Sequence, residues 1–99
     1  MKQRRRQSRD GGEAAAAQLS VAALTFIAED PERLGRFLAL TGIGPESLRT
    51  AAREPHFLLG VLEYLLGDES LLVAFAEHSA IDPMDVERAR GTLAGETSQ

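Results

Sequence analysis

Apolar residues recur at intervals of three and four along most of the chain, which is the period of one helix face. Over about 13–28 the predicted buried stripe consists of Leu19, Ala22, Ala23, Phe26 and Ile27. Over about 31–41 it consists of Leu34, Phe37, Leu38 and Thr41. The pattern therefore predicts two amphipathic helices, each burying one face.

Short polar residues and prolines mark where these helices begin and end. Asp30 can cap a helix through its carboxylate, and Pro31 suits the first helical position because that position needs no N–H. Gly42 follows the second helix, where a left-handed residue is common. Pro45 opens a short third helix that runs to about Arg53. The first half of the chain thus predicts three helices joined by tight turns.

The second half predicts three more helices, of which the first is the most apolar. Residues 55–66 are apolar on nearly every side, apart from a narrow strip made of His56, Gly60, Glu63 and Gly67. A helix of this kind is expected at the centre of a fold. Two further helices are predicted over about 69–79 and from Pro83 to residue 94, and the tail, residues 95–99, is expected to fray.

The two halves resemble each other. A shift of 38 residues aligns 19–52 with 57–90 without a gap. The identical pairs are Leu24 and Leu62, Asp30 and Asp68, Leu34 and Leu72, Phe37 and Phe75, Ile43 and Ile81, Pro45 and Pro83, and Ala51 and Ala89. They fall on caps, turns and apolar stripes, although any two capped amphipathic helix pairs look somewhat alike. The predicted fold is all-α, a compact bundle of about six short helices in two related three-helix units.

Two stretches also carry the pattern of a known family. Residues 29–49, EDPERLGRFLALTGIGPESLR, and residues 54–83 resemble the Domain of Unknown Function 3572 family, small proteins found mainly in alphaproteobacteria. The positions that carry the resemblance are Asp30, Pro31, Arg33, Leu34, Phe37, Leu38, Gly42, Pro45 and Leu48. The resemblance covers roughly residues 21–94 and implies no activity, cofactor or partner.

Length and composition favour one small cytoplasmic domain. The chain has 99 residues and no cysteine, which excludes disulfides, thiolate nucleophiles and Cys-ligated metals. The longest apolar stretch, 57–67, is too short to span a bilayer and contains Glu63. The basic N-terminus is not followed by an uninterrupted apolar region, so neither export nor membrane insertion is expected.

Charge is distributed unevenly along the chain. Residues 1–9 carry a charge of +5, from Lys2, Arg4, Arg5, Arg6 and Arg9, whereas residues 10–99 carry −9. Residues 1–13 are predicted to form a disordered basic arm because they contain too little apolar surface to order themselves. Residues 14–94 are predicted to form a single helical domain, with the repeat units at about 19–52 and 57–90.

Candidate chemistry is sparse, and we expect no enzyme, cofactor, metal site or small-molecule substrate. His56 is expected in solvent and His78 at the C-terminal end of a helix, with no partner at metal-ligand spacing for either. The adjacent Glu77 points away from His78 because neighbouring helical residues do not share a face. Gly42 and Gly44 do not form a phosphate-binding loop. No catalytic, cofactor-binding or metal-ligating residue is therefore predicted.

Protein–protein interaction is the function that the sequence favours. The helix over 55–66 is apolar on more sides than two neighbours easily cover, so part of it is expected to bind an unidentified protein partner. This partner is either a second copy, with the helix over 55–66 or the first helix meeting about a twofold axis, or a helix held in a groove. The alternative is a nucleic-acid accessory protein that binds phosphates through residues 2–9, although the acidic body opposes such binding.

Overall fold

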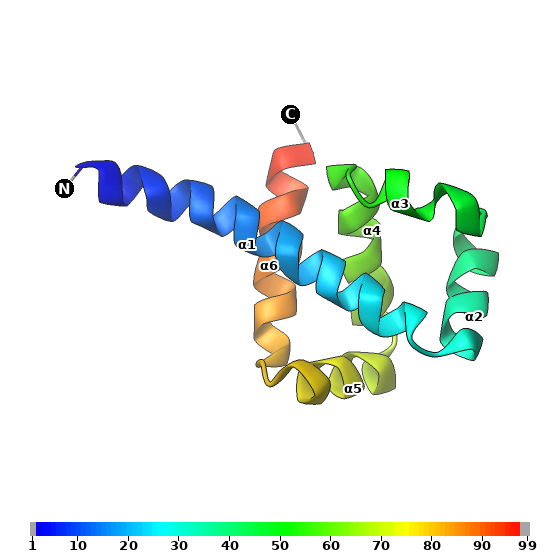
Figure 1. Cartoon of the computed structure of the whole chain (residues 1–99). Coiled ribbons are helices and arrows are strands. Elements are labelled where there is room, and N and C mark those ends of the chain that lie inside the picture. Colours follow the sequence, from blue (N-terminus) through cyan, green and yellow to red (C-terminus); the bar gives the residue numbers. More distant parts are fainter. Residues whose placement is uncertain (1, 98–99) are drawn as a thin grey trace.

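The chain is described by a computed structural model, which covers the backbone of residues 2–97 and the side chains of residues 12–95. The described residues form α-helices and one 3₁₀ turn, and no strand is found among them. In order these are α1 (Lys2–Ala28), α2 (Pro31–Thr41), the 3₁₀ turn η1 (Pro45–Ser47), α3 (Leu48–Ala51), α4 (Pro55–Leu66), α5 (Glu69–Ser79) and α6 (Pro83–Thr97). The predicted all-α bundle of six helices is confirmed (Figure 1).

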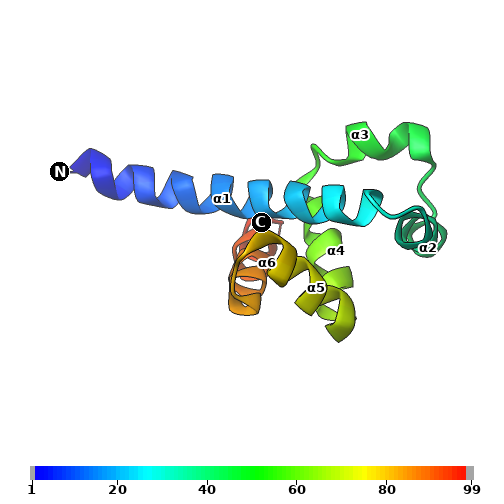
Figure 2. The ribbon, with the colours of Figure 1, turned by 60° about the horizontal axis from the view of Figure 1, so that its bottom comes forward.

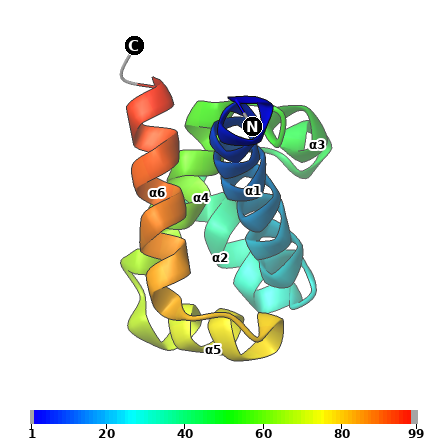
Figure 3. The same cartoon turned by 90° about the vertical axis from the view of Figure 1, so that its left-hand side faces the viewer.

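Three helices build the centre of the fold. Figure 3 shows α6, α4 and α1 side by side, and each of them packs extensively against the other two. Helix α5 closes one end of α4, and α2 lies beyond the C-terminal end of α1 (Figure 1). The side chains least exposed to solvent come mainly from these elements: Ala23, Ile27, Phe37, Val61, Leu62, Leu65, Phe75, Val86 and Leu93. One contiguous core results.

Helix α4 occupies the centre, as its composition predicts. The strip of His56, Gly60, Glu63 and Gly67 is exposed, and the apolar residues of α4 are all buried or partly buried. The rings of Phe57 and Tyr64, for example, contact that of Phe37 from α2. The expectation that α4 keeps an uncovered apolar face for a partner is therefore wrong, because α1, α2, α5 and α6 together cover it.

The buried side of α1 differs from the predicted stripe. Ala22 is exposed, whereas Ser20 is fully buried beside Ala16 and Ala23. A buried serine is tolerated here because its hydroxyl donates a hydrogen bond to the carbonyl oxygen of Ala16 at 2.8 Å. The contacts with α4 and α6 thus select the face of α1 that carries residues 16, 20, 23 and 27.

Helix α1 is longer than the sequence predicts. It begins at Lys2, not near Glu13, and includes Gly11 and Gly12. Figure 1 and Figure 2 show its first turns projecting beyond the rest of the fold. Helix α6 likewise runs to Thr97. The predicted disorder of 1–13 and fraying of 95–99 stay predictions, since the side chains of 1–11 and 96–99 lie outside the described residues.

Under the 38-residue shift the local structure of the two halves coincides. The shift carries α2 onto α5, and each helix begins with an extended aspartate, Asp30 or Asp68, whose carboxylate accepts a backbone N–H. Each helix is followed by a left-handed residue, Gly42 or Ala80. The same types of cap at the same offset explain why the ends of these helices match.

The tertiary arrangement of the two halves does not coincide. Helix α6 packs along α4, whereas its counterpart, η1 and the four-residue α3, makes few contacts with α1. A short element cannot reproduce the packing of a fifteen-residue helix. The internal repeat of three-helix units is therefore not confirmed and stays a prediction.

The two left-handed residues lead to opposite predictions. Ala80→Gly is expected to raise the free energy of unfolding by about 1 kcal/mol, because φ at Ala80 is +57° and glycine adopts that region without strain. Gly42→Ala is expected to lower it by about 1 kcal/mol. A Cβ at Gly42 would meet nothing within 4 Å, so this cost is conformational. Urea denaturation measures both, and stabilisation by Gly42→Ala would contradict the left-handed turn.

Candidate functional site

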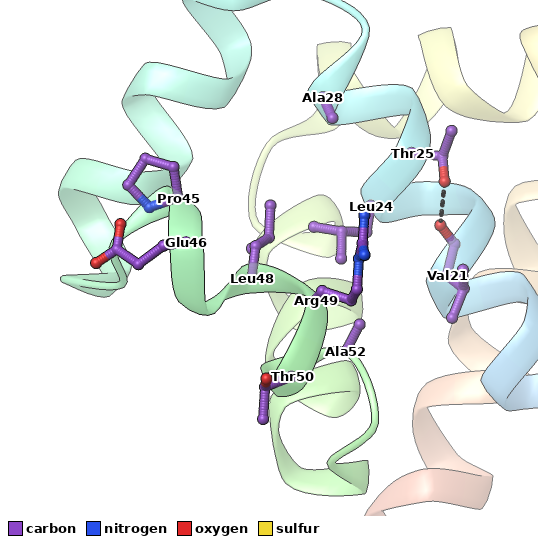
Figure 4. A pocket seen from close by; sticks show the side chains of 10 residues that line it. All are labelled: Val21, Leu24, Thr25, Ala28, Pro45, Glu46, Leu48, Arg49, Thr50 and Ala52. Atoms are coloured by element: carbon purple, nitrogen blue, oxygen red, sulfur yellow. Dashed lines mark hydrogen bonds between the residues drawn. The ribbon is translucent and has the colours of Figure 1, made fainter.

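An open groove lies beside the C-terminal half of α1. Its other wall is the 45–52 segment, which comprises η1, α3 and Ala52. The groove has a volume of about 750 Å³, and Figure 4 shows the lining side chains. Those from α1 are Val21, Leu24, Thr25 and Ala28, and those from the 45–52 segment are Pro45, Glu46, Leu48, Arg49, Thr50 and Ala52. The groove exists because the 45–52 segment packs only loosely against α1.

The groove has an apolar floor and a mixed rim. Leu24 is buried and Leu48 partly buried at its base, whereas Val21 is 41% exposed. The hydroxyl of Thr25 donates to the carbonyl oxygen of Val21 at 2.9 Å, so it is already satisfied within α1 (Figure 4). Glu46 and Arg49 are exposed on the opposite wall. Such a surface suits an apolar side chain or a helix more than a polar ligand.

A second, smaller hollow lies on the same side of α1, nearer its N-terminus. It measures about 400 Å³, and its walls are α1, Arg53 and the adjoining parts of α4 and α6. From α1 it is lined by Glu13, Ala14 and Ala17. The two hollows follow one another along α1, since residues 14, 17, 21, 24 and 28 are spaced by three and four.

The solvent side of α1 carries no charge over its last four turns. We call this surface the α1 face, and it comprises Ala14, Ala15, Gln18, Val21, Ala22, Thr25 and Ala28, all of them exposed. An exposed helix face normally carries charged residues, and charged residues make up 26% of this chain. Basic residues 2–9 and then Asp10 and Glu13 precede the face, and Glu29, Asp30 and Glu32 follow it. The face and the groove share Val21, Thr25 and Ala28.

Sequence reasoning missed this face because it assigned α1 a single apolar stripe. Alanine counts as apolar on either side of a helix, so a run such as AAAAQLSVAA does not reveal which side is buried. The usable signal was the absence of charge between Glu13 and Glu29. Three further large apolar side chains are exposed in the described structure, Leu40, Val73 and Met84, and each lies on a different helix.

The structure places the two histidines on different helices. His56 is exposed in the first turn of α4, as predicted. His78 lies near the end of α5, with its ring centroid 5.0 Å from that of Phe26 and its Nε2 atom 3.9 Å from Oε1 of Glu29. Among the described side chains, no three His, Cys, Asp or Glu residues gather into a metal-binding group. The expectation that the protein lacks a catalytic or metal site stays a prediction.

Several arginines of the body are paired within their own neighbourhood. Arg88 and Arg90 of α6 bind Asp85 and Glu87 at 3.0 and 2.9 Å. The hydrogen bonds that Glu87 accepts raise the pKa of Arg90. Helix α6 therefore presents a neutralised surface, unlike the basic helix that a nucleic-acid reader needs.

The family model described as "Protein of unknown function (DUF3572)" matches residues 13–96. The chain belongs to the DUF3572 family. The resemblance seen in the sequence is thus confirmed, while the alphaproteobacterial origin that it implies stays a prediction. No curated protein and no solved structure matches the chain.

The DUF3572 match takes in every residue of the α1 face and of both hollows. It begins after the basic residues 2–9, which lie outside the matched part. None of the described helices has the length and apolar character that a bilayer-spanning segment requires. The family description names no activity, so a function for this region has to be argued from its surface features.

Proposed function

We propose that this DUF3572 protein is a non-catalytic protein–protein interaction module and that it binds a partner helix along the α1 face and into the adjoining groove. The observation that carries the proposal is the combination of an uncharged, exposed helix face with an apolar groove along its edge. Amphipathic helices bind such surfaces through apolar residues at i, i+3, i+4 and i+7.

The dimensions of the site support a helical partner. From Ala14 to Ala28 the α1 face extends over about 21 Å, which corresponds to about four turns of a facing helix. The groove volume of about 750 Å³ accommodates the larger side chains of one face of that helix. Gln18 and Thr25 are the polar members of the face, and the hydroxyl of Thr25 is already bonded. A partner can therefore cover the α1 face itself without burying a charged side chain of that face.

The chemistry of the groove favours binding over catalysis. Its ionisable groups are Glu46 and Arg49, and both stand exposed on one wall. An active site instead needs convergent groups that face one another across a pocket.

We further propose a cytoplasmic location, because a chain without cysteine cannot form the disulfides that an oxidising compartment favours.

A photocross-linker at Thr25 tests the proposal in the native host. We expect it to trap partner chains with the wild-type surface and to lose at least about 90% of the product with Val21→Glu, since a carboxylate on an apolar contact must be desolvated. Val73→Glu is the matched control, because Val73 is 42% exposed on α5 and Val21 is 41% exposed on α1. Circular dichroism checks that both variants are folded. Equal cross-linking by all three proteins would refute the site.

A second candidate function rests on the projecting turns of α1. These turns hold the basic residues 2–9 away from the acidic body (Figure 1), so the segment can approach a nucleic-acid backbone with less repulsion. Fluorescence anisotropy with DNA and RNA would then show salt-sensitive binding that deletion of residues 2–9 abolishes.

A further inference from the structure

We infer that residues 43–53, which include the 45–52 segment, form a strap that opens as a unit while the rest of the fold stays closed. Opening removes one wall from each of the two hollows beside α1 and so joins them into one longer groove. Entry to the proposed helix-binding groove then depends on a conformational change. This consequence for binding rests on the proposed function, whereas the opening itself does not.

The strap is anchored at its two ends and not between them. Before it, Phe37 of α2 is 1% exposed, and its ring contacts that of Tyr64 in α4 with a centroid separation of 5.1 Å. After it, Leu58 of α4 is 4% exposed. No residue between Phe37 and Leu58 is buried, whereas α1, α2, α4, α5 and α6 each bury at least one side chain. The strap therefore adds no fully buried side chain to the core.

Few interactions fasten the strap to the rest of the fold. Its apolar contacts with the core come from Leu48 and Ala52, which are partly buried. Among the described residues, no side chain of the strap forms a hydrogen bond or an ion pair. The backbone N–H groups of Ser47, Ala52 and Arg53 donate to carbonyl oxygens within the strap, at 3.0, 2.9 and 3.1 Å. Two partly buried side chains thus have to offset the conformational entropy that the whole strap loses when it closes.

The position of the strap allows it to move without displacing a longer helix. Figure 2 shows η1 and α3 as an arch that leaves the end of α2 and returns at the start of α4, on the side of α1 away from α5 and α6. Gly42, with φ of +76°, precedes the arch, and Glu54, in an extended conformation, follows it. Outward rotation of the arch withdraws Leu48 from the groove and uncovers Leu24 of α1 (Figure 4). Regions with few buried contacts open at a lower free energy than global unfolding requires.

Both hollows beside α1 lose a wall when the strap opens. The 45–52 segment is one wall of the groove, and Arg53, at the end of the strap, lines the second hollow. The α1 residues that remain form one row along the helix: Ala14, Ala17, Val21, Leu24 and Ala28. A partner helix along α1 therefore meets one groove in the open state, and its binding shifts the population toward that state.

Native-state hydrogen exchange of the purified chain, followed by NMR at increasing urea concentration, tests the opening. The reporters are the amides of Ser47, Ala52 and Arg53, and the amides of Val61 and Leu62 in α4 are the control. We expect the strap amides to be at least about 100-fold less protected and almost independent of low urea concentrations, since a local opening exposes little surface. Protection and urea dependence equal to those of α4 would show that the strap opens only on global unfolding, which would overturn the inference.

Leu48→Ala distinguishes opening of the whole strap from fraying of single turns. The variant loses much of the contact that holds the strap closed, so all three reporter amides are expected to exchange at least about tenfold faster. Leu40→Ala is the matched control, because Leu40 is 69% exposed on α2 and its truncation is expected to leave these rates unchanged. Acceleration at Ala52 alone, whose N–H donates to the carbonyl oxygen of Leu48, would show fraying and contradict opening as a unit.

Thiol labelling tests whether the opening uncovers the groove, since the chain has no cysteine of its own. Leu24 is 7% exposed, Val21 41% and Leu62 0%. With a bulky maleimide, Leu24→Cys is expected to react more slowly than Val21→Cys and faster than Leu62→Cys, which reacts only on global unfolding. A rate equal to that of Val21→Cys would show a floor that is open without movement of the strap. A rate equal to that of Leu62→Cys would show a floor that the strap never uncovers, and either result would overturn the inference.

The two proposals fail separately, because the exchange and labelling experiments use the purified chain alone. A strap that opens locally, in a chain whose Thr25 cross-linker traps no Val21-dependent product, would refute the proposed function and leave the strap standing. A strap that opens only on global unfolding, in a chain that does give the Val21-dependent product, would overturn the inference and leave the interaction function standing.

Discussion

Replacement of Phe75 by alanine is expected to lower the free energy of unfolding by about 3–5 kcal/mol, and the same change at Phe37 by a similar amount. Both side chains are 1% exposed. The ring of Phe75 contacts Phe26 of α1 with a centroid separation of 5.6 Å, and the ring of Phe37 contacts Tyr64 of α4 at 5.1 Å. Truncation therefore leaves a cavity between elements that cannot close without repacking.

Urea denaturation monitored by circular dichroism measures this effect. Small domains have a total stability of about 5–15 kcal/mol, so either variant approaches the unfolding threshold and is best studied at low temperature. The 38-residue repeat places Phe37 and Phe75 at matching positions. A near-neutral result at one of them would show that the two halves are not equivalent even in the core.

Leu93→Ala is expected to cost about 2–5 kcal/mol. Leu93 is 2% exposed in α6, and α6 packs against both α1 and α4. The residue lies outside the aligned repeat units, so its importance comes from the length of α6 and not from the repeat. Its truncation would leave a cavity among the three central helices.

Leu40→Ala is the matched control for Leu93→Ala. Leu40 is 69% exposed on α2, so the same substitution there is expected to change stability by less than about 0.5 kcal/mol. Thermal and urea unfolding of the two variants side by side give the comparison. Equal losses would contradict the packing of α6 at the centre.

The ends of α2 and α5 were predictable from sequence because they depend on a few adjacent residues. Asp30 and Asp68 supply the carboxylates that accept backbone N–H groups, and the observed helices, 31–41 and 69–79, have the predicted bounds. The central place of α4 was predictable for a similar reason, since its polar strip is narrow enough to identify the only side that can face solvent.

The α1 face could not be predicted in the same way. In an alanine-rich helix, exposed Ala22 and buried Ala23 are chemically identical, and only the approach of α4 and α6 distinguishes them. The groove depends on the loose packing of the 45–52 segment, which no local pattern encodes. The prediction of an uncovered apolar face on α4 was wrong because the sequence does not show how many helices pack against α4. That number depends on how the helices are arranged in three dimensions.

The amino-acid sequence thus determined the helical fold, the family and most helix ends, because caps, turns and apolar periodicity act over a few residues. It also set the absence of charged residues between Glu13 and Glu29. Only the tertiary structure decided which side of α1 is left uncovered, because burial depends on contacts between residues far apart in the chain. That exposed side is where we propose that a partner helix binds.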